Sequence, residues 1–155
     1  MTERPLREGR TLVVGVQTRV CALPLIHVIE TMRPLLIEPV AGAPSFVRGV
    51  SVIRGVPTPV VDLGTLLGTS GGGGRRFVTL RLGHRQVALS VDTVLGVREL
   101  EASTVKELPP LLQGVSQDAI EAIGTLDHQV LIVLGAGWQL PTEVLQALAL
   151  RAESQ

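Results

Sequence analysis

Aromatic residues are scarce in this chain: its 155 residues include one Trp, two Phe and no Tyr. Proteins that hold single-stranded nucleic acid stack its bases on several aromatic rings. The charges also cancel, because 14 basic residues balance 14 acidic ones and leave no net positive field for a polyanion. The sequence therefore argues against nucleic-acid binding. Its core has to be built from Val, Leu and Ile, which favours β structure.

Cysteine and long apolar runs are nearly absent as well. Cys21 is the sole cysteine, which excludes an internal disulfide and suits a reducing compartment. We interpret it as a buried, unreactive thiol. No apolar run approaches the length of a membrane span, and the polar start lacks the apolar segment of a secretory signal. We therefore expect a cytoplasmic location and no direct membrane insertion.

The residue patterns that hold cofactors or metals are not recognisable either. The run 71–76, Gly-Gly-Gly-Gly-Arg-Arg, could hold an anion, but it lacks the Lys-Ser/Thr ending of a phosphate-binding loop. It is more typical of a mobile connector between strands. The histidines lack the spacing of metal ligands, and we expect all three to be exposed loop residues: His27, His84 and His128. The sequence predicts no cofactor and no metal.

Catalytic side chains form no convincing set. No Gly-x-Ser-x-Gly nucleophile motif occurs. Asp62, Asp92 and Asp127 could act together as acid and base, but each sits at a strand end, where a carboxylate ordinarily accepts backbone hydrogen bonds. We expect no enzyme. The alternative is a small hydrolase or ligand-binding β protein that uses Asp62, Asp92 and His128 in a cleft.

Alternating apolar residues and Gly-containing reversals predict a series of hairpins. The paired strands are 12–16 with 20–25, 49–53 with 56–63, 77–82 with 86–91, and 120–125 with 129–134. Further predictions are a helical turn or irregular strand at 26–32, a short strand at 35–38, a helical turn at 63–67, a strand at 94–100 and a turn at 103–107. In strand 77–82, Thr79 and Arg81 alternate with apolar residues, so we expect them on a wet face.

A weak internal repeat appears when the sequence is shifted against itself so that Arg19 meets Arg85. The same shift aligns Ala22, Leu23, Leu25, Val28 and Ile29 with Ala88, Leu89, Val91, Val94 and Leu95. Chance similarity between Val/Leu-rich strands is the alternative explanation. A true repeat would favour two small barrels packed on each other, because each half alone has a marginal core.

The stretch 46–63 is the most specific part of the chain. Gly55 permits a positive φ at the reversal and leaves Arg54 at the tip of the hairpin. Pro57 and Pro59 cannot donate to a ladder, so that portion of the second strand should lie at an edge or carry a bulge. On residue types alone, this is a hairpin with a solvated arginine.

The string as a whole resembles the CheW-like adaptor domain of bacterial chemotaxis systems. The matching residues are Phe46, Gly49-Val50, Ile53-Arg54-Gly55, Pro59-Val60-Val61-Asp62-Leu63, Val91-Asp92-Thr93-Val94 and Ile123-Gly124-Thr125. The resemblance implies a mostly β fold of two SH3-like five-stranded β-barrel lobes packed together with a C-terminal helix. We expect a flexible N-terminus over 1–11, a single domain over 12–150 and a tail over 151–155. Lobe 1 would be mainly 12–68, lobe 2 mainly 76–135 and the helix 141–150, with the chain free to cross between lobes.

The same resemblance implies a function and its partners. CheW-like adaptors are non-catalytic scaffolds that bind the regulatory domain of the histidine kinase CheA and the cytoplasmic tip of chemoreceptors. The chain would then couple receptor to kinase at membrane-associated receptor arrays. An adaptor of a two-component pathway other than chemotaxis is the alternative within the same family.

Carried over by resemblance, the protein-binding residues lie near a groove for the receptor. Arg54 and Glu30 fall on positions where family members commonly carry the same charges, and a pair between them would position the hairpin tip. Val28 and Val91 would supply apolar wall, and Gly55 the turn. A solvated Glu30 is the alternative.

Three positions depart from the pattern of the family. Val52 stands where Asn is frequent, Ala88 where Gly is common and Gly135 where Asp or Asn is frequent, and the chain contains no Asn. A Val side chain cannot hydrogen-bond, so the local geometry of the hairpin at Val52 is expected to differ.

Overall fold

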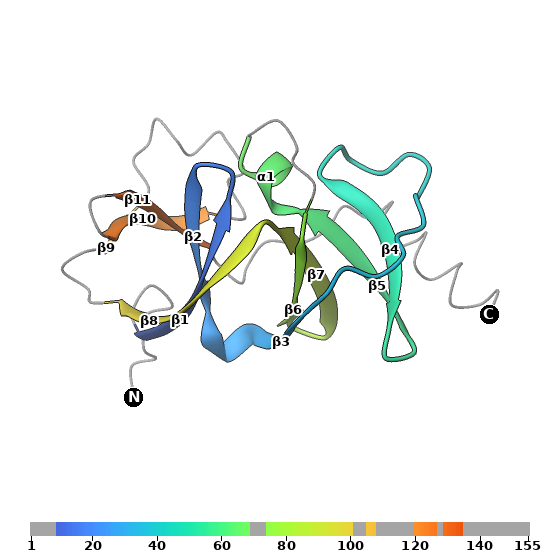
Figure 1. The fold of residues 1–155 in the computed structure, drawn as a ribbon, viewed down its shortest axis with the longest axis horizontal. Helices are drawn as coiled ribbons and strands as arrows, with labels where there is room; N and C mark the ends of the chain where they lie inside the picture. The colour runs from blue at the N-terminus through green and yellow to red at the C-terminus, as the bar shows by residue number, and fades with distance from the viewer. Residues whose placement is uncertain (1–8, 69–73, 101–104, 108–119, 127–128, 135–155) are drawn as a thin grey trace.

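The computed structural model describes residues 9–68, 74–100, 105–107, 120–126 and 129–134. Most of these described residues lie in eleven strands (Figure 1). The strands are β1 (Gly9–Val16), β2 (Arg19–Pro24), β3 (Val28–Met32), β4 (Val47–Ile53), β5 (Val56–Asp62), β6 (Arg76–Leu82), β7 (Arg85–Val91), β8 (Thr93–Leu100), β9 (Val105–Glu107), β10 (Ile120–Leu126) and β11 (Gln129–Leu134). A 3-10 turn η1 (Leu25–His27) precedes β3, and a one-turn helix α1 (Leu63–Leu66) follows β5.

The strands form two sheets that lie side by side, sheet A on the left of Figure 1 and sheet B on the right. Sheet A has the order β8-β1-β2-β11-β10-β9, and sheet B has the order β3-β6-β7-β5-β4. Sheet B has the five strands expected of each lobe. In sheet A, β9 adds a sixth strand where the sequence pattern had indicated only a turn.

The two sheets repeat one topology, which supports the internal repeat seen in the sequence. In each, an antiparallel hairpin (β1–β2 or β6–β7) pairs in parallel with the second strand of another hairpin (β10–β11 or β4–β5). The shift that aligns the sequence repeat also carries the pair Leu12↔Leu23 of sheet A onto Val78↔Leu89 of sheet B. The second hairpins correspond at a slightly larger shift, and even their register irregularities coincide, between Val47 and Gly49 and between Ile120 and Ala122.

Each sheet mixes strands from both halves of the chain: sheet A holds β1 and β2 with β8–β11, and sheet B holds β3–β5 with β6 and β7. β3 follows β2 in sequence but pairs with β6 in sheet B, and β8 follows β7 but pairs with β1 in sheet A. The expected lobe boundaries, 12–68 and 76–135, therefore do not coincide with the sheets. Long-range pairing decides the sheet to which a strand belongs, and local sequence pattern does not report that pairing.

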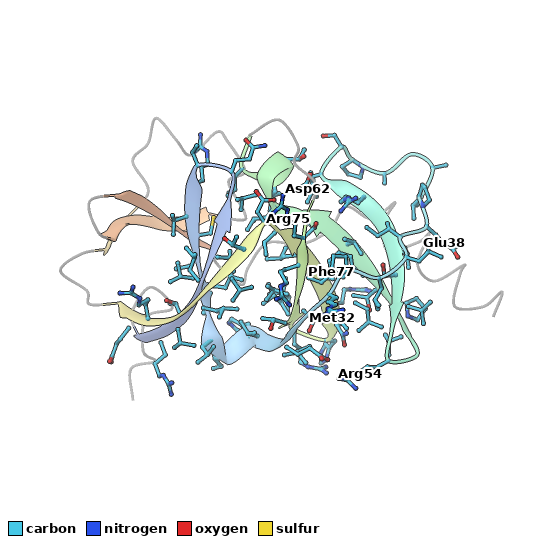
Figure 2. The ribbon with its side chains drawn as sticks, in the orientation of Figure 1. Met32, Glu38, Arg54, Asp62, Arg75 and Phe77 are labelled. Atoms are coloured by element: carbon cyan, nitrogen blue, oxygen red, sulfur yellow. The ribbon has the colours of Figure 1, made fainter. Side chains whose placement is uncertain are left out.

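The main core lies between the sheets and draws on both. Its fully buried side chains include Val14 and Leu23 from sheet A and Val61, Val78 and Leu89 from sheet B. A smaller cluster joins the β4–β5 hairpin to β6 and β7 and contains Ile53, Val60, Phe77 and Ala88. Figure 2 shows Phe77 and Met32 side by side on the inner side of that hairpin. Burial of aliphatic side chains from both sheets makes the two lobes one unit.

Several local predictions are corrected by the structure. Residues 9–11 belong to β1, and Thr11 is buried, so the first strand begins earlier than residue 12. The segment 35–38 contributes a single bridge, Glu38↔Val50, that covers the edge of β4. Thr79 is fully buried because β6 is a central strand with both faces covered over 77–80. The expected helix at 141–150 lies outside the described residues.

Candidate partner-binding site

The β4–β5 hairpin ends in a tight two-residue turn that presents Arg54. Ile53 pairs with Val56, and the two residues between them, Arg54 and Gly55, both have positive φ, 50° and 80°. Two consecutive positive φ values are typical of the type I′ turn that matches the twist of a hairpin. The Arg54 side chain is 75% exposed. The hairpin predicted from sequence is thus confirmed, and its tip is open to solvent.

Pro57 and Pro59 lie in the part of β5 that has a paired strand on one side only, as predicted. β5 as a whole lies between β4 and β7, but its ladder with β7 includes only Val60 to Asp62. Pro57 and Pro59 pair only with β4, opposite Val52 and Val50. Their missing donors therefore remove no hydrogen bond on the β7 side.

Glu30 is placed on β3 by a β-bulge. Val28 lies opposite Leu80 and Glu30 opposite Thr79, which leaves Ile29 as the extra residue. The Thr79 hydroxyl accepts the backbone N–H of Glu30 at 3.2 Å and lies 3.3 Å from the Glu30 carbonyl, to which it can donate. Thr79 is fully buried, so this contact is shielded from water.

Glu30 and Arg54 form a bidentate ion pair between β3 and the hairpin turn. Arg54 Nε donates to Glu30 Oε2 at 2.7 Å and the second guanidinium nitrogen to Oε1 at 2.9 Å. Figure 2 places Arg54 at the lower end of the molecule, by the turn. The hydrogen bonds from Arg54 lower the pKa of Glu30, and the same bonds raise the pKa of Arg54. A fork-to-fork pair fixes orientation even where exposure makes its energy small.

The remaining predicted site residues differ in accessibility. Val28 is half-buried and packs on the main core, and Gly55 is exposed in the turn. Val91 is a core residue with no exposed surface, so it is not a wall that a partner can contact directly. Its position at the end of β7, between the two sheets, buries it. Val52, the departure beside the turn, is 49% exposed and does not disturb the hairpin ladder.

The two described aspartates of the hydrolase alternative hold separate turns. Asp62 caps α1: its carboxylate accepts from the N–H of Gly64 at 3.2 Å and the hydroxyl of Thr65 at 2.9 Å. Asp92 accepts from the N–H of Gln17 at 2.7 Å. Both do what a carboxylate at a strand end ordinarily does. Asp127 and His128 lie outside the described residues.

Cys21 and His27 show two different kinds of burial. Cys21 is buried, and loss of solvation raises the pKa of its thiol to about 12, so it is unreactive at neutral pH. His27 is half-buried in η1, and its Nε2 is buried without a hydrogen-bond partner, which corrects the expectation of an exposed loop residue. His84 is exposed in the β6–β7 turn, as predicted.

The described residues hold neither a metal-ligand cluster nor a membrane-spanning helix. In the ranges that the structure covers, no three His, Cys, Asp or Glu side chains gather as they would around a metal ion. Within the same ranges, no helix has the length and apolar character needed to cross a membrane.

Comparison with known proteins identifies the family. The sequence model of the CheW-like domain matches residues 10–137. The chain belongs to the CheW-like domain family. This match spans both sheets and includes Glu30, Thr79 and Arg54.

Individual relatives agree with the family and the fold. The chain is 29% identical over 98 residues to chemotaxis protein CheW of Klebsiella aerogenes, covering 61% of this chain and 59% of that protein. It is 35% identical over 96 residues to protein FrzA of Myxococcus xanthus, covering 59% and 58%. The aligned part thus spans about three-fifths of the length of each curated relative. The scaffolding protein TtCheW from Thermoanaerobacter tengcongensis has the same fold, with a TM-score of 0.72 at 22% identity over 83% of this chain and 89% of that one.

Proposed function

We propose that this protein is a non-catalytic adaptor that couples a chemoreceptor to a CheA-type histidine kinase. Membership of the CheW-like family supports this role. So do the names of two relatives, one a chemotaxis protein and the other a scaffolding protein. The partners are the regulatory domain of the kinase and the cytoplasmic tip of the receptor, met in the cytoplasm at receptor arrays.

The observation that carries the proposal is the paired hairpin tip. An exposed arginine usually samples many rotamers, and ordering it on a partner costs side-chain entropy. Here Glu30 already holds Arg54 in one orientation through two hydrogen bonds. We propose that Glu30, Arg54, Gly55 and the half-buried Val28 form the contact surface for the receptor tip. The surface is pre-organised, so binding loses little rotamer freedom.

Co-sedimentation tests this function. Membranes bearing the receptor are mixed with the kinase and with wild type, Arg54→Ala or Glu30→Arg, and the kinase in the pellet is measured. Wild type should carry kinase into the pellet, and both variants should lose most of that amount while unfolding at the same denaturant concentration as wild type. Arg19→Ala is the matched control, because Arg19 is an exposed arginine beside the β1–β2 turn, at the opposite end of the molecule from the β4–β5 turn (Figure 1).

The outcomes separate the function from the site. If wild type carries no kinase to the membranes, the adaptor function is wrong. If wild type does so and both variants match it, the adaptor function stands and the contact surface lies elsewhere.

A coupling role in another two-component pathway is the second candidate. The relative from Myxococcus matches at higher identity than the one from Klebsiella, and its name does not mention chemotaxis. To distinguish the two pathways, native cytoplasm is passed over the immobilised chain and the retained kinase is identified. The receptor operon to which that kinase belongs then indicates the pathway.

A further inference from the structure

The bulge that carries Glu30 has a counterpart in sheet A with different chemistry. In the alignment of the internal repeat, Glu30 corresponds to Gly96 and Thr79 to Val13. Gly96 lies opposite Val13 at the register irregularity between β1 and β8, as Glu30 lies opposite Thr79 between β3 and β6. The topology thus places a bulge at the same point of both sheets, once with glycine and valine and once with glutamate and threonine.

A glutamate would rarely adopt the backbone conformation that Gly96 has at its bulge. Gly96 has a φ of 120°, a conformation that residues with a Cβ rarely adopt. Among the described residues, the non-glycine residues with positive φ are Gln17 and Arg54, so Glu30 occupies its bulge with an ordinary φ. A different backbone conformation at the bulge needs its own stabilising contacts.

The Thr79 hydroxyl supplies those contacts. It is within hydrogen-bond reach of both backbone groups of Glu30, the N–H at 3.2 Å and the carbonyl at 3.3 Å. Val13, the counterpart in sheet A, has the same branched shape and no hydroxyl, so it cannot do this. Of these two bulges, the hydroxyl therefore accompanies the one at which the residue opposite it is Glu30 and not glycine.

We propose that Thr79 is a positioning residue: its hydroxyl fixes the backbone of Glu30 at the bulge and thereby orients the Glu30 carboxylate toward Arg54. This deepens the proposed function, and its importance for partner binding rests on it. The orientation itself is a property of the isolated chain. A rotation of the Glu30 backbone would move the carboxylate away from the fork of Arg54, since two parallel hydrogen bonds require both groups in one plane.

The test is an NMR titration of the isolated full chain. The probes are the Glu30 side-chain carboxyl signal against pH and the Arg54 Nε–H signal, the latter assigned by its loss in Arg54→Ala. Thr79→Val keeps the shape of the side chain and removes the hydroxyl, as Val13 does in sheet A. We expect the pKa of Glu30 to rise toward the ordinary value of a glutamate and the Arg54 Nε–H signal to move to that of a free arginine. Thr79→Ser should retain both wild-type signals.

Thr11→Val is the matched control. Thr11 is also fully buried, and its hydroxyl donates to the carbonyl of Arg98 on β8 at 3.0 Å, in the other sheet. We expect this variant to lose a comparable amount of stability and to leave the Glu30 and Arg54 signals unchanged. If Thr79→Val does not fold, Thr79→Ala removes the same hydroxyl without the second methyl group, and the same signals are followed.

Two results would overturn the proposal. One is a Glu30 titration in Thr79→Val that coincides with that of wild type. The other is an equal shift in Thr11→Val, which would make the effect one of general loosening. Co-sedimentation with kinase and receptor membranes is measured separately. Wild type that fails there removes the proposed function, and the titration result for Thr79 still stands.

Discussion

The bulges of the two sheets show how one topology can be put to different uses. In sheet A, the residue at the bulge is Gly96, which has a φ of 120° and no side chain. In sheet B, the residue at the bulge is Glu30. Its backbone N–H donates to the Thr79 hydroxyl, and its carboxylate pairs with Arg54 at the hairpin tip. The position that corresponds to Arg54 in the sequence of the other hairpin is Asp127, so sheet A lacks both members of the pair. The repeat supplies the frame, and the residues at a few equivalent positions decide whether one end of it carries the ion pair.

The largest expected effect on stability is at Gly49, a second equivalent position at which the two sheets carry different residues. Gly49 has a φ of 146°, and a Cβ there would overlap the carbonyl of Glu38, which bridges to Val50. Its counterpart in sheet A is Ala122. We expect Gly49→Ala to lower the free energy of unfolding by about 3 kcal/mol, because strain and the overlap act together. Urea unfolding measures it.

Gly83→Ala is the control for Gly49→Ala. Gly83 has a φ of 65° in the β6–β7 turn, and a Cβ there meets nothing within 4 Å. Backbone strain alone should cost about 1 kcal/mol. Equal losses for the two variants would contradict the close approach of Glu38 to β4.

The second-largest expected effect is a loss of stability at alkaline pH that comes from Cys21 in sheet A. Cys21 in sheet A corresponds to Val87 in sheet B, and burial raises the pKa of its thiol from 9.0 to about 12. Above the ordinary pKa, the unfolded chain loses this proton and the folded chain keeps it, so stability falls as pH rises through this window. At about pH 10 the loss should be about 1.4 kcal/mol.

Cys21→Val, which copies sheet B, isolates this contribution. The chain has no Tyr and a single Lys, so few other side chains titrate in the same range. Between neutral and alkaline pH, the urea midpoint of wild type should fall, and the midpoint of the variant should fall less. A wild-type alkaline loss that persists unchanged in Cys21→Val would show that another group is responsible.

The smallest effect on stability is expected at the hairpin tip. Arg54 has a positive φ, which Asn tolerates better than Arg, and Asn-Gly is the preferred type I′ sequence. Arg54→Asn should therefore unfold at the same denaturant concentration as wild type or a slightly higher one. The variant should still fail to recruit kinase to membranes. A clear loss of stability would show that the ion pair, and not the turn, holds the hairpin.

Much of the fold could be predicted because its signals are local. Alternating Val and Leu residues with Gly at the reversals give the four hairpins, and Asp62 caps the helical turn that follows β5. The exchange of β3 and β8 between the sheets could not be predicted in the same way. It depends on pairings between residues far apart in the sequence, such as Val28 with Leu80.

The site could be predicted in part. Resemblance to the family placed Glu30 and Arg54 together, and the structure shows that they form a pair. Thr79 was expected on a wet face and Val91 in the wall of a groove, and both are buried, because burial depends on how the two sheets pack. Thr79 alternates with apolar residues as an exposed residue would, yet β6 is covered on both faces. A polar residue within an otherwise apolar central strand was the available signal.

We propose that the Glu30–Arg54 pair presents a surface through which a receptor controls a kinase. The most direct test is the rate of kinase autophosphorylation in the presence of receptor membranes, with wild type, Arg54→Ala or no added chain. We expect strong stimulation by wild type and, with equally folded Arg54→Ala, a rate close to that without the chain. Full stimulation by Arg54→Ala would contradict it.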